Sequence, residues 1–132
     1  MIIQNAETSH EVHLGDCRDM TAVGDEAVDL IVTSPPYWCI KDYGHPGQIG
    51  LEQSYEDYLA ALEQVKALGL RVLRPGCRFG LNIGDQYLRA SEHGRYRIQP
   101  IPADLTLIGR RLGFDFMGSI IWRKISTTNT TG

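Results

Sequence analysis

An apolar run that ends at two consecutive prolines constrains the fold of this chain more than any other feature. Residues 29–32 (Asp-Leu-Ile-Val) are typical of a buried strand. After Thr33 comes Ser34-Pro35-Pro36-Tyr37-Trp38, which we call the motif turn. Neither proline has a backbone N–H, and Pro35 restricts the residue before it to an extended backbone, so the strand must end in a stiff turn. That turn carries a hydroxyl, a free carbonyl and two aromatic rings, which together can hold a planar ring that bears an amine.

Strand-like and helix-like segments alternate along the chain. The sequence predicts strands at residues 12–14, 28–33, 78–83 and 114–122, and helices that open at Ser54 and near Pro102. The first helix starts with a sequence like a capping box and is ended by Arg74-Pro75-Gly76, and the second runs to Leu112. The apolar positions of the first helix, at helical spacing, are Tyr58, Leu62, Val65, Leu68 and Val72. Strands separated by helices indicate βαβ units, so we expect one α/β domain over residues 1–132 with a mostly parallel sheet.

The composition narrows the class of protein. The chain has 132 residues and a net charge of −3, which argues against a broad basic coat and leaves a local patch for any contact with nucleic acid. Its three cysteines are in no CxxC spacing and its four histidines form no recognisable ligand set, so we expect neither a disulfide framework nor a metal site. The sequence contains no signal peptide and no long apolar span. We therefore expect a cytoplasmic protein without membrane contact.

Three polar residues each come just after a predicted strand: Asp16, Ser34 and Asp85. If these strands are parallel, the three residues lie at the carboxyl edge of one sheet, where open α/β sheets bind ligands. Aspartate also favours turns for conformational reasons, so a structural role stays open for either aspartate alone. Agreement among the three positions favours a binding site.

The motif turn has the groups needed to hold a nucleobase. Aromatic faces stack on bases at roughly 1–3 kcal/mol per base, which helps to hold a base that has been extruded from a duplex. The Ser34 hydroxyl and the Pro35 carbonyl can both accept hydrogen bonds from an exocyclic amine. Those bonds would point the lone pair of the nitrogen out of the ring plane towards an electrophilic methyl group. Proximity and alignment would then supply most of the rate.

At these residues the chain resembles the amino-methyltransferases of DNA, the S-adenosylmethionine-dependent enzymes that methylate cytosine N4 or adenine N6. Ser34-Pro35-Pro36-Tyr37 matches their catalytic motif, Asp/Asn/Ser-Pro-Pro-Tyr/Phe/Trp. Further segments match in the order typical of the family's β class and cover nearly the whole chain. They are Leu14-Gly15-Asp16-Cys17, Val28-Asp29-Leu30-Ile31-Val32-Thr33, Val72-Leu73-Arg74-Pro75-Gly76, Asn82-Ile83-Gly84-Asp85 and Gly118-Ser119-Ile120-Ile121-Trp122-Arg123-Lys124.

The resemblance implies a Rossmann-like methyltransferase core, S-adenosylmethionine as cofactor, and double-stranded DNA with a flipped target base as substrate, in the setting of restriction-modification. Serine in the first motif position resembles the cytosine-N4 group more than the adenine-N6 group, so cytosine N4 is the expected target and adenine N6 stays open. The residues assigned to catalysis are Ser34, Pro35, Pro36 and Tyr37, those assigned to the base are Tyr37 and Trp38, and those assigned to the cofactor are Asp16, Cys17 and Asp85.

The chain also departs from the family pattern. The glycine-rich cofactor loop, Phe-x-Gly-x-Gly, and the usual target-recognition region lie downstream in this class, and the 132 residues contain neither. We therefore expect the N-terminal portion of an enzyme, with an incomplete core, that has little activity alone and needs a C-terminal half or a second subunit. Two alternatives stay open: a non-catalytic module for nucleic-acid binding or assembly, and an N-methyltransferase that acts on RNA or protein amides.

A polar segment at residues 86–99 contains Arg89, Arg95 and Arg97. These arginines are candidates for contacts with DNA phosphates. A solvated surface loop explains them equally well at this stage, because arginine is common on protein surfaces.

Overall fold

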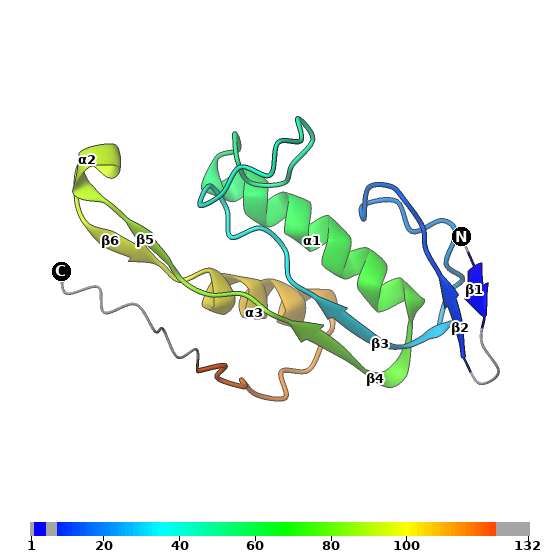
Figure 1. Cartoon of the computed structure of the whole chain (residues 1–132). Helices are drawn as coiled ribbons and strands as arrows, with labels where there is room; N and C mark the ends of the chain where they lie inside the picture. Colours follow the sequence, from blue (N-terminus) through cyan, green and yellow to red (C-terminus); the bar gives the residue numbers. More distant parts are fainter. Residues whose placement is uncertain (1, 5–7, 124–132) are drawn as a thin grey trace.

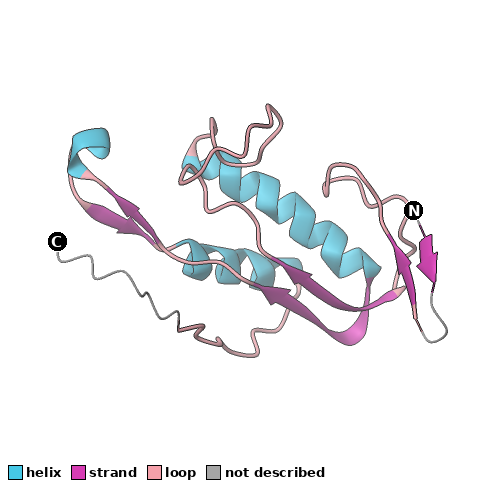
Figure 2. Cartoon of the chain, in the orientation of Figure 1, coloured by secondary structure: helices cyan, strands magenta, loops and turns pink. Residues whose placement is uncertain are grey.

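The structure is a computed structural model that describes residues 2–4 and 8–123. Its elements in chain order are β1 (Ile2–Gln4), β2 (Ser9–Glu11), β3 (Val28–Thr33), α1 (Tyr55–Val72), β4 (Leu73–Leu81), β5 (Gln86–Leu88), α2 (Ala90–His93), β6 (Arg97–Gln99) and α3 (Ile101–Leu112). In these ranges the strands form three two-stranded sheets, β1–β2, β3–β4 and β5–β6. The β1–β2 pair lies at one end of the molecule and the β5–β6 pair, with α2 at its tip, at the other, and α1, α3 and the β3–β4 pair lie between them (Figures 1 and 2).

The centre of the fold is a β3–α1–β4 unit. The two strands are parallel, and their register runs from Leu30 opposite Arg78 to Thr33 opposite Leu81. This confirms the βαβ unit predicted from the alternation of strands and helices. The other two sheets are antiparallel, so only this pair represents the parallel sheet in the part of the chain that the structure describes.

The first helix begins as predicted and ends slightly earlier. The Ser54 hydroxyl accepts a hydrogen bond from the backbone N–H of Asp57 at 3.0 Å, so Ser54 is the N-cap of the helix. The helix ends at Val72, and the chain enters β4 directly at Leu73. Residues 74–76 therefore lie inside β4, at a shift in the strand register where the ladder is interrupted. Because the ladder is already interrupted here, Pro75 and the left-handed Gly76 break no further hydrogen bonds between the two strands.

The core lies between the two long helices. Its buried residues are Tyr58 and Leu62 of α1 and Ile101, Leu105 and Ile108 of α3. The helical spacing predicted for α1 is confirmed by burial at four of its five apolar positions. Those four are Tyr58, Leu62, Val65 and Val72. The second predicted helix is α3, and it ends before a glycine in the left-handed conformation, as helices often do.

Only one face of the β3–β4 sheet is covered. Ile31 and Phe79 face the helices, and Phe79 lies against Gly69 of α1, where an added Cβ would be 2.5 Å from the ring. Glycine at that position allows the helix to approach the sheet closely. On the opposite face, Leu30 and Val32 are 59% and 74% exposed. Strands of parallel sheets are usually buried on both faces, whereas the described residues cover this sheet on one face.

Two predicted strands are wrong. Residues 12–14 are irregular and exposed, and the strand lies just before them at Ser9–Glu11, where β1 provides a partner. Residues 114–122 are apolar but form no strand, and apart from a half-buried Phe114 most of their large side chains are exposed. A strand needs a neighbouring strand for its backbone hydrogen bonds, and no strand in the described ranges lies alongside this segment.

A hairpin leaves the core between the sheet and α3. It consists of β5, the short helix α2 and β6, and it was not predicted because its strands are only three residues long. No helix in the described ranges is long and apolar enough to cross a membrane.

Candidate active site

The motif turn directly follows β3 and is held by three long-range hydrogen bonds. The carbonyl of Thr33, at its start, accepts from the backbone N–H of Asn82 at 2.9 Å. The hydroxyl of Tyr58, a side chain that is 0% exposed, donates to the Pro36 carbonyl at 2.8 Å. The indole Nε1–H of Trp38 donates to the Gln53 carbonyl at 2.9 Å. The turn is therefore fixed to β4, to α1 and to the loop that precedes α1.

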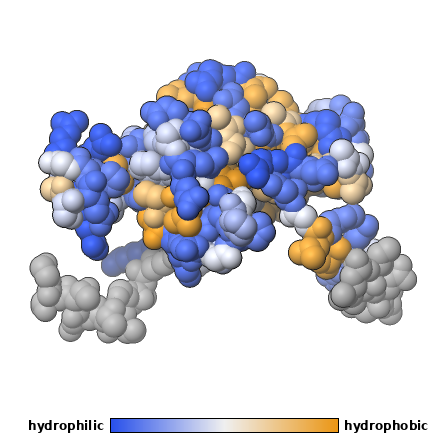
Figure 3. All heavy atoms as spheres, turned by 90° about the horizontal axis from the view of Figure 1, so that it is seen from above, coloured by the Kyte–Doolittle hydropathy of each residue, from blue (hydrophilic) through white to orange (hydrophobic). Residues whose placement is uncertain are grey.

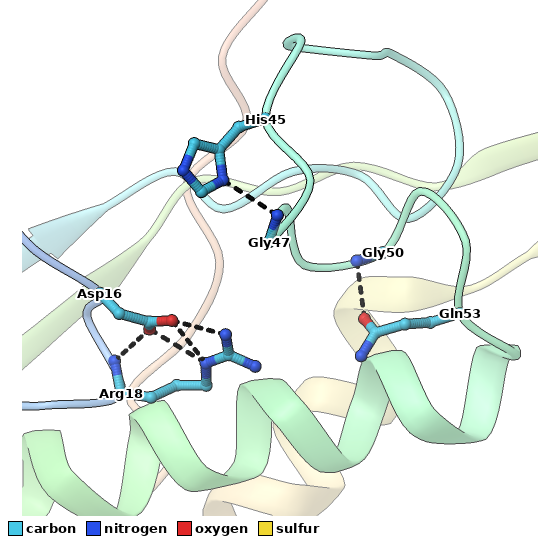
Figure 4. A network of polar contacts seen from close by, with 6 residues as sticks. All are labelled: Asp16, Arg18, His45, Gly47, Gly50 and Gln53. Atoms are coloured by element: carbon cyan, nitrogen blue, oxygen red, sulfur yellow. Dashed lines mark hydrogen bonds and ion pairs between the residues drawn. The ribbon is translucent and has the colours of Figure 1, made fainter.

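The end of the turn is stabilised by a close approach of backbone to backbone. Trp38 has a φ of 50°, a conformation that non-glycine residues rarely adopt. Gly50 packs on it so tightly that an added Cβ would lie 2.7 Å from the Trp38 carbonyl oxygen. The side-chain amide oxygen of Gln53 accepts from the Gly50 N–H at 2.7 Å, as Figure 4 shows. These contacts explain why glycine is required in the predicted functional loop.

Two acceptors of the turn stay available. In the described part of the chain, neither the Ser34 hydroxyl nor the Pro35 carbonyl has a hydrogen-bond partner, whereas the Pro36 carbonyl is occupied by Tyr58. Ser34 is exposed and Pro35 is half-buried. The structure thus leaves accessible the same two acceptors that the sequence assigns to an exocyclic amine.

Ser34 lies between two cavities. One has a volume of about 250 Å³ and is lined by Ser34, Tyr37, Ile40, Lys41 and Tyr43. The other has a volume of about 280 Å³ and lies between the sheet, α1 and α3. It is mostly apolar and includes Cys17, Met20, Ile31, Pro35, Phe79 and Leu105. A group held at Ser34 can therefore be reached from two sides.

Tyr37 and Trp38 have different surroundings. Tyr37 lines the smaller cavity and its ring lies over Gly84, where an added Cβ would be 3.3 Å from the ring. Trp38 lines neither cavity. Its ring meets the edge of Tyr55 at a centroid distance of 5.1 Å and lies 6.3 Å from the ring of His93. Of the two aromatic residues assigned to the base, Tyr37 alone faces a cavity.

The residues assigned to the cofactor are spread around the site. Cys17 lines the larger cavity together with Ser34 and Pro35. Burial raises the pKa of the Cys17 thiol, and the neighbouring Asp16 carboxylate raises it further, so the sulfur is a neutral thiol rather than a nucleophile. Asp85 is exposed after β4 and lines neither cavity.

Asp16 is engaged by a neighbour two residues away. Its carboxylate accepts from the backbone N–H of Arg18 at 2.8 Å and from the Arg18 Nε–H at 3.0 Å. These side-chain and backbone hydrogen bonds lower the pKa of Asp16 to about 2. His45, in the loop across from the Asp16 turn, adds a small effect in the same direction (Figure 4). The carboxylate is thus charged at neutral pH, and an incoming donor must share it with Arg18.

Some residues of the site were missed at the level of sequence. Tyr58 was assigned to the core face of α1, and its hydroxyl was not considered. A tyrosine on a buried helix face needs a partner for its O–H, and that requirement is a usable signal. Met20, Lys41 and Tyr43 also line the cavities, but no local pattern marks them. Within the described ranges, no three His, Cys, Asp or Glu side chains are grouped to hold a metal ion.

A comparison with known protein families shows to which family the chain belongs. The family model described as DNA methylase, which covers N6 and N4 methyltransferases, matches residues 28–132. The chain belongs to this DNA methylase family. The match includes β3, the motif turn, α1, β4 and α3, and it confirms the resemblance inferred from the motif turn.

Named relatives of this chain are type II methyltransferases, in agreement with the family model. The type II methyltransferase M.SfiI of Streptomyces fimbriatus is 42% identical over 77 residues, which are 58% of this chain and 18% of that protein. The type II methyltransferase M.SmaI of Serratia marcescens is 40% identical over 80 residues, or 60% and 27% of the two chains. For M.MjaVI of Methanocaldococcus jannaschii the identity is 33% over 108 residues, 81% of this chain and 50% of the relative. The chain thus spans half or less of the length of these relatives.

A solved structure confirms the fold class of this chain. The putative DNA modification methylase of Thermus thermophilus, in complex with S-adenosyl-L-methionine, has a TM-score of 0.66 and 32% identity to it. The match covers 86% of this chain and 49% of the Thermus chain. The fold is therefore α/β with part of a Rossmann-like methyltransferase core, in which the β3–β4 pair is the parallel sheet.

Proposed function

We propose that this DNA methylase transfers a methyl group from S-adenosylmethionine to an exocyclic amine of a base in double-stranded DNA, with cytosine N4 preferred over adenine N6. The observation that carries the proposal is the position of Ser34, which has a free hydroxyl and borders both cavities. In a methyl transfer the amine and the methyl donor approach the methyl carbon from opposite sides. Two cavities that meet at Ser34 offer a place for each of them.

The acceptor base is assigned to the smaller cavity. The target amine lies at Ser34, which lines both cavities, and donates its two N–H groups to the Ser34 hydroxyl and to the carbonyl of Pro35, which lines the larger cavity. Tyr37, held over Gly84, provides a flat face for the base. Extrusion of the base from the duplex costs a few kcal/mol, which stacking on such a face offsets in part.

The residues around the larger cavity fit a cofactor with a flat apolar part and hydroxyl groups. Its lining is mostly apolar, which suits an adenine ring, and its volume of about 280 Å³ is near the lower end for ligand sites. Cys17 lines this cavity, and the charged carboxylate of Asp16, its neighbour in sequence, suits a hydroxyl or amine donor. When bound, S-adenosylmethionine supplies an electrophilic methyl group on a sulfonium centre.

The chemical role of Ser34 follows from its neutral side chain. A hydroxyl accepts a hydrogen bond from the amine but does not remove a proton as a carboxylate can. The amine nitrogen would therefore bond to the methyl carbon while the bond from that carbon to the sulfonium sulfur breaks, which leaves a neutral thioether, and the nitrogen would then lose one proton. Because Ser34 is exposed, that proton passes to solvent. No covalent bond to the protein is formed.

The proposal includes a requirement for a glycine-rich cofactor loop. The 132 residues contain no Phe-x-Gly-x-Gly sequence, so we propose that the chain alone transfers methyl groups poorly and needs a segment that carries this loop. The same absence favours the alternative function, a non-catalytic module that keeps the base pocket for binding or assembly.

One experiment tests these statements. The chain is incubated with tritium-labelled S-adenosylmethionine and duplex DNA, alone and with an added segment from a relative that contains the glycine-rich loop. The DNA is then digested and the methylated bases are separated by chromatography. We expect N4-methylcytosine in the complemented reaction and little product from the chain alone. Ser34→Ala removes an acceptor of the amine and should abolish the product, while Arg110→Gln on α3 should have no effect.

The possible products distinguish the cytosine assignment, the requirement for the loop and the enzyme proposal from one another. N6-methyladenine as the product would overturn the cytosine assignment but keep the enzyme. Vigorous methylation by the chain alone would overturn the requirement for the loop. If calorimetry detects no binding of S-adenosylmethionine with or without the added segment, the enzyme reading fails and the non-catalytic module is favoured.

A further inference from the structure

The hairpin of residues 86–99, which we call the arm, is the part of the molecule that the proposed function does not use. β5 and β6 pair antiparallel, from Gln86 opposite Gln99 to Leu88 opposite Arg97, and α2 forms the tip. Figure 1 shows the arm extending away from the helices at the end opposite to β1 and β2. It is thus a two-stranded ribbon with a free outer surface.

The arm concentrates positive charge that has no internal partner. It contains three arginines and one glutamate, although the whole chain has a net charge of −3. In the part of the chain that the structure describes, Arg89, Arg95 and Arg97 form no ion pair. Several arginines elsewhere are paired: Arg18 with Asp16, Arg71 with Asp25 and Arg74 with Asp29. Exposed, unpaired guanidinium groups are the ones available to an external anion.

The arm also exposes a pair of aromatic rings. Tyr87 and Tyr96 are 63% and 64% exposed, and their ring centroids are 6.3 Å apart. Apart from these rings the surface of the arm is largely hydrophilic, as the left side of Figure 3 shows. Tyrosine and arginine together are the residue types enriched at interfaces, where the ring gives contact area and the hydroxyl gives a hydrogen bond.

Two contacts fix the arm beside the motif turn. At its tip, the ring of His93 lies 6.3 Å from the ring of Trp38. At its base, the amide Nε2–H of the buried Gln86 donates to the sulfur of Cys39 at 3.1 Å. A partner that lies on the arm is therefore close to Trp38 and Cys39, at the end of the motif turn.

We propose that the arm binds the phosphate backbone of the DNA duplex next to the extruded base, through Arg89, Arg95 and Arg97. The inference rests on the proposed function for the identity of the substrate. The planar guanidinium group of arginine donates two parallel hydrogen bonds to a phosphate, and such charge-assisted bonds are stronger than neutral ones. Contacts to phosphates orient a protein on the duplex without reading its sequence, so the arm positions the motif turn rather than selecting the site.

The test measures how DNA binding by the full chain depends on salt. Fluorescence anisotropy with a labelled duplex at several salt concentrations gives the slope of log K against log salt. Each arginine that contacts a phosphate contributes about −0.9 to this slope. Arg89→Gln, Arg95→Gln and Arg97→Gln should therefore each make the slope less steep by about 0.9, and the triple variant by about 2.7. Arg110→Gln removes another exposed charge, near the end of α3, and is the matched control, with an unchanged slope expected.

The results are decisive in either direction. A slope unchanged in the triple variant, an equal change in Arg110→Gln, or no binding of the wild-type chain to duplex DNA would overturn the proposal. Loss of affinity for one DNA sequence only would also overturn it, because it indicates base contacts instead. Circular dichroism confirms that the variants are folded. Since anisotropy needs no cofactor and no methyl transfer, failure of the arm and failure of the proposed reaction are seen in separate experiments.

Discussion

Replacement of Tyr58 by phenylalanine tests whether α1 holds the motif turn in position. The change removes one hydroxyl and leaves the ring that forms part of the core. Tyr58 is 22 residues from Pro36 in sequence, so its hydrogen bond is a purely tertiary contact with the turn. Burial raises the pKa of Tyr58 to about 12, so the hydroxyl is protonated and donates at pH 7.

The expected loss of stability follows from the geometry of the bond. At 2.8 Å, the O–H···O distance is typical of a well-formed hydrogen bond, whose net contribution is about 1 kcal/mol. The Pro36 carbonyl would also lose its partner, which costs about 1–3 kcal/mol if the group stays dry. Because Pro36 is only half-buried, water can reach it and the lower figures apply. We expect Tyr58→Phe to lower the free energy of unfolding by about 1–2 kcal/mol.

Tyr55→Phe is the matched control. Tyr55 lies one turn away on α1, and its hydroxyl donates to Asp104 at 2.6 Å, a bond that does not involve the motif turn. Urea unfolding followed by circular dichroism should show a lower midpoint for both variants, with unchanged slopes. A local probe separates them: hydrogen exchange of the Trp38 indole N–H, which is bonded to Gln53. Tyr58→Phe should speed this exchange by about tenfold for each 1.4 kcal/mol of lost local stability, and Tyr55→Phe should leave it unchanged.

Two results would refute this reasoning. Equal exchange rates for the Trp38 indole in the two variants would mean that the Tyr58 bond does not control the turn. A Tyr58→Phe variant as stable as the wild type would mean that the hydroxyl exchanges its protein partner for water without cost.

Three further substitutions test the packing around the site. Gly69→Ala should destabilise the fold by about 1–2 kcal/mol in urea unfolding, because the added Cβ would lie 2.5 Å from the Phe79 ring and overpacking outweighs the better helix propensity of alanine. In a Phe79→Leu background the sign should reverse, and a cost that persists there would contradict the assigned clash. Burial lowers the pKa of Lys66, so its charged form destabilises the fold at neutral pH and this penalty fades as the pH rises towards the ordinary value of 10.5. Lys66→Met should therefore be most favourable relative to wild type at pH 7 and less so at pH 9.5, and urea midpoints that differ by the same amount at both pH values would exclude this explanation. Gly84→Ala should shift the NMR resonances of the Tyr37 ring with little change in stability, since the neighbour must yield by only a few tenths of an ångström from 3.3 Å; unshifted resonances would show that the ring does not lie over Gly84.

The sequence predicted those parts of the fold that depend on local patterns. The end of β3 at the two prolines, the cap at Ser54 and the stop at Gly113 each depend on residues within one turn of the feature. The strands predicted at residues 12–14 and 114–122 failed for the opposite reason. An apolar run is compatible with a strand, but a partner elsewhere in the chain decides whether the strand forms.

In the candidate site, too, the features that depend on local sequence were predicted and those that depend on tertiary contacts were not. The available acceptors, Ser34 and Pro35, follow from the local sequence, and the structure leaves both without a partner in the described residues. The pairing of Asp16 with Arg18 is also local, but the sequence analysis considered the carboxylate alone. The bond from Tyr58 to the turn could not be derived from spacing, because it depends on how α1 lies over β3.

The stiffness of the motif turn has a consequence for how the site works. In the proposed reaction, a shift of the reacting groups by as little as about 1 Å would lower the rate, so the acceptors proposed at Ser34 and Pro35 would have to be held in place although Ser34 is exposed. Two prolines limit the backbone of the turn, but they do not attach it to the rest of the protein. Besides the bond from Asn82 to the Thr33 carbonyl, that attachment comes from Tyr58 of α1 and from Gln53 in the loop just before it. The first helix therefore supports the geometry of the site as well as the core, and substitutions on its buried face should affect chemistry as well as stability.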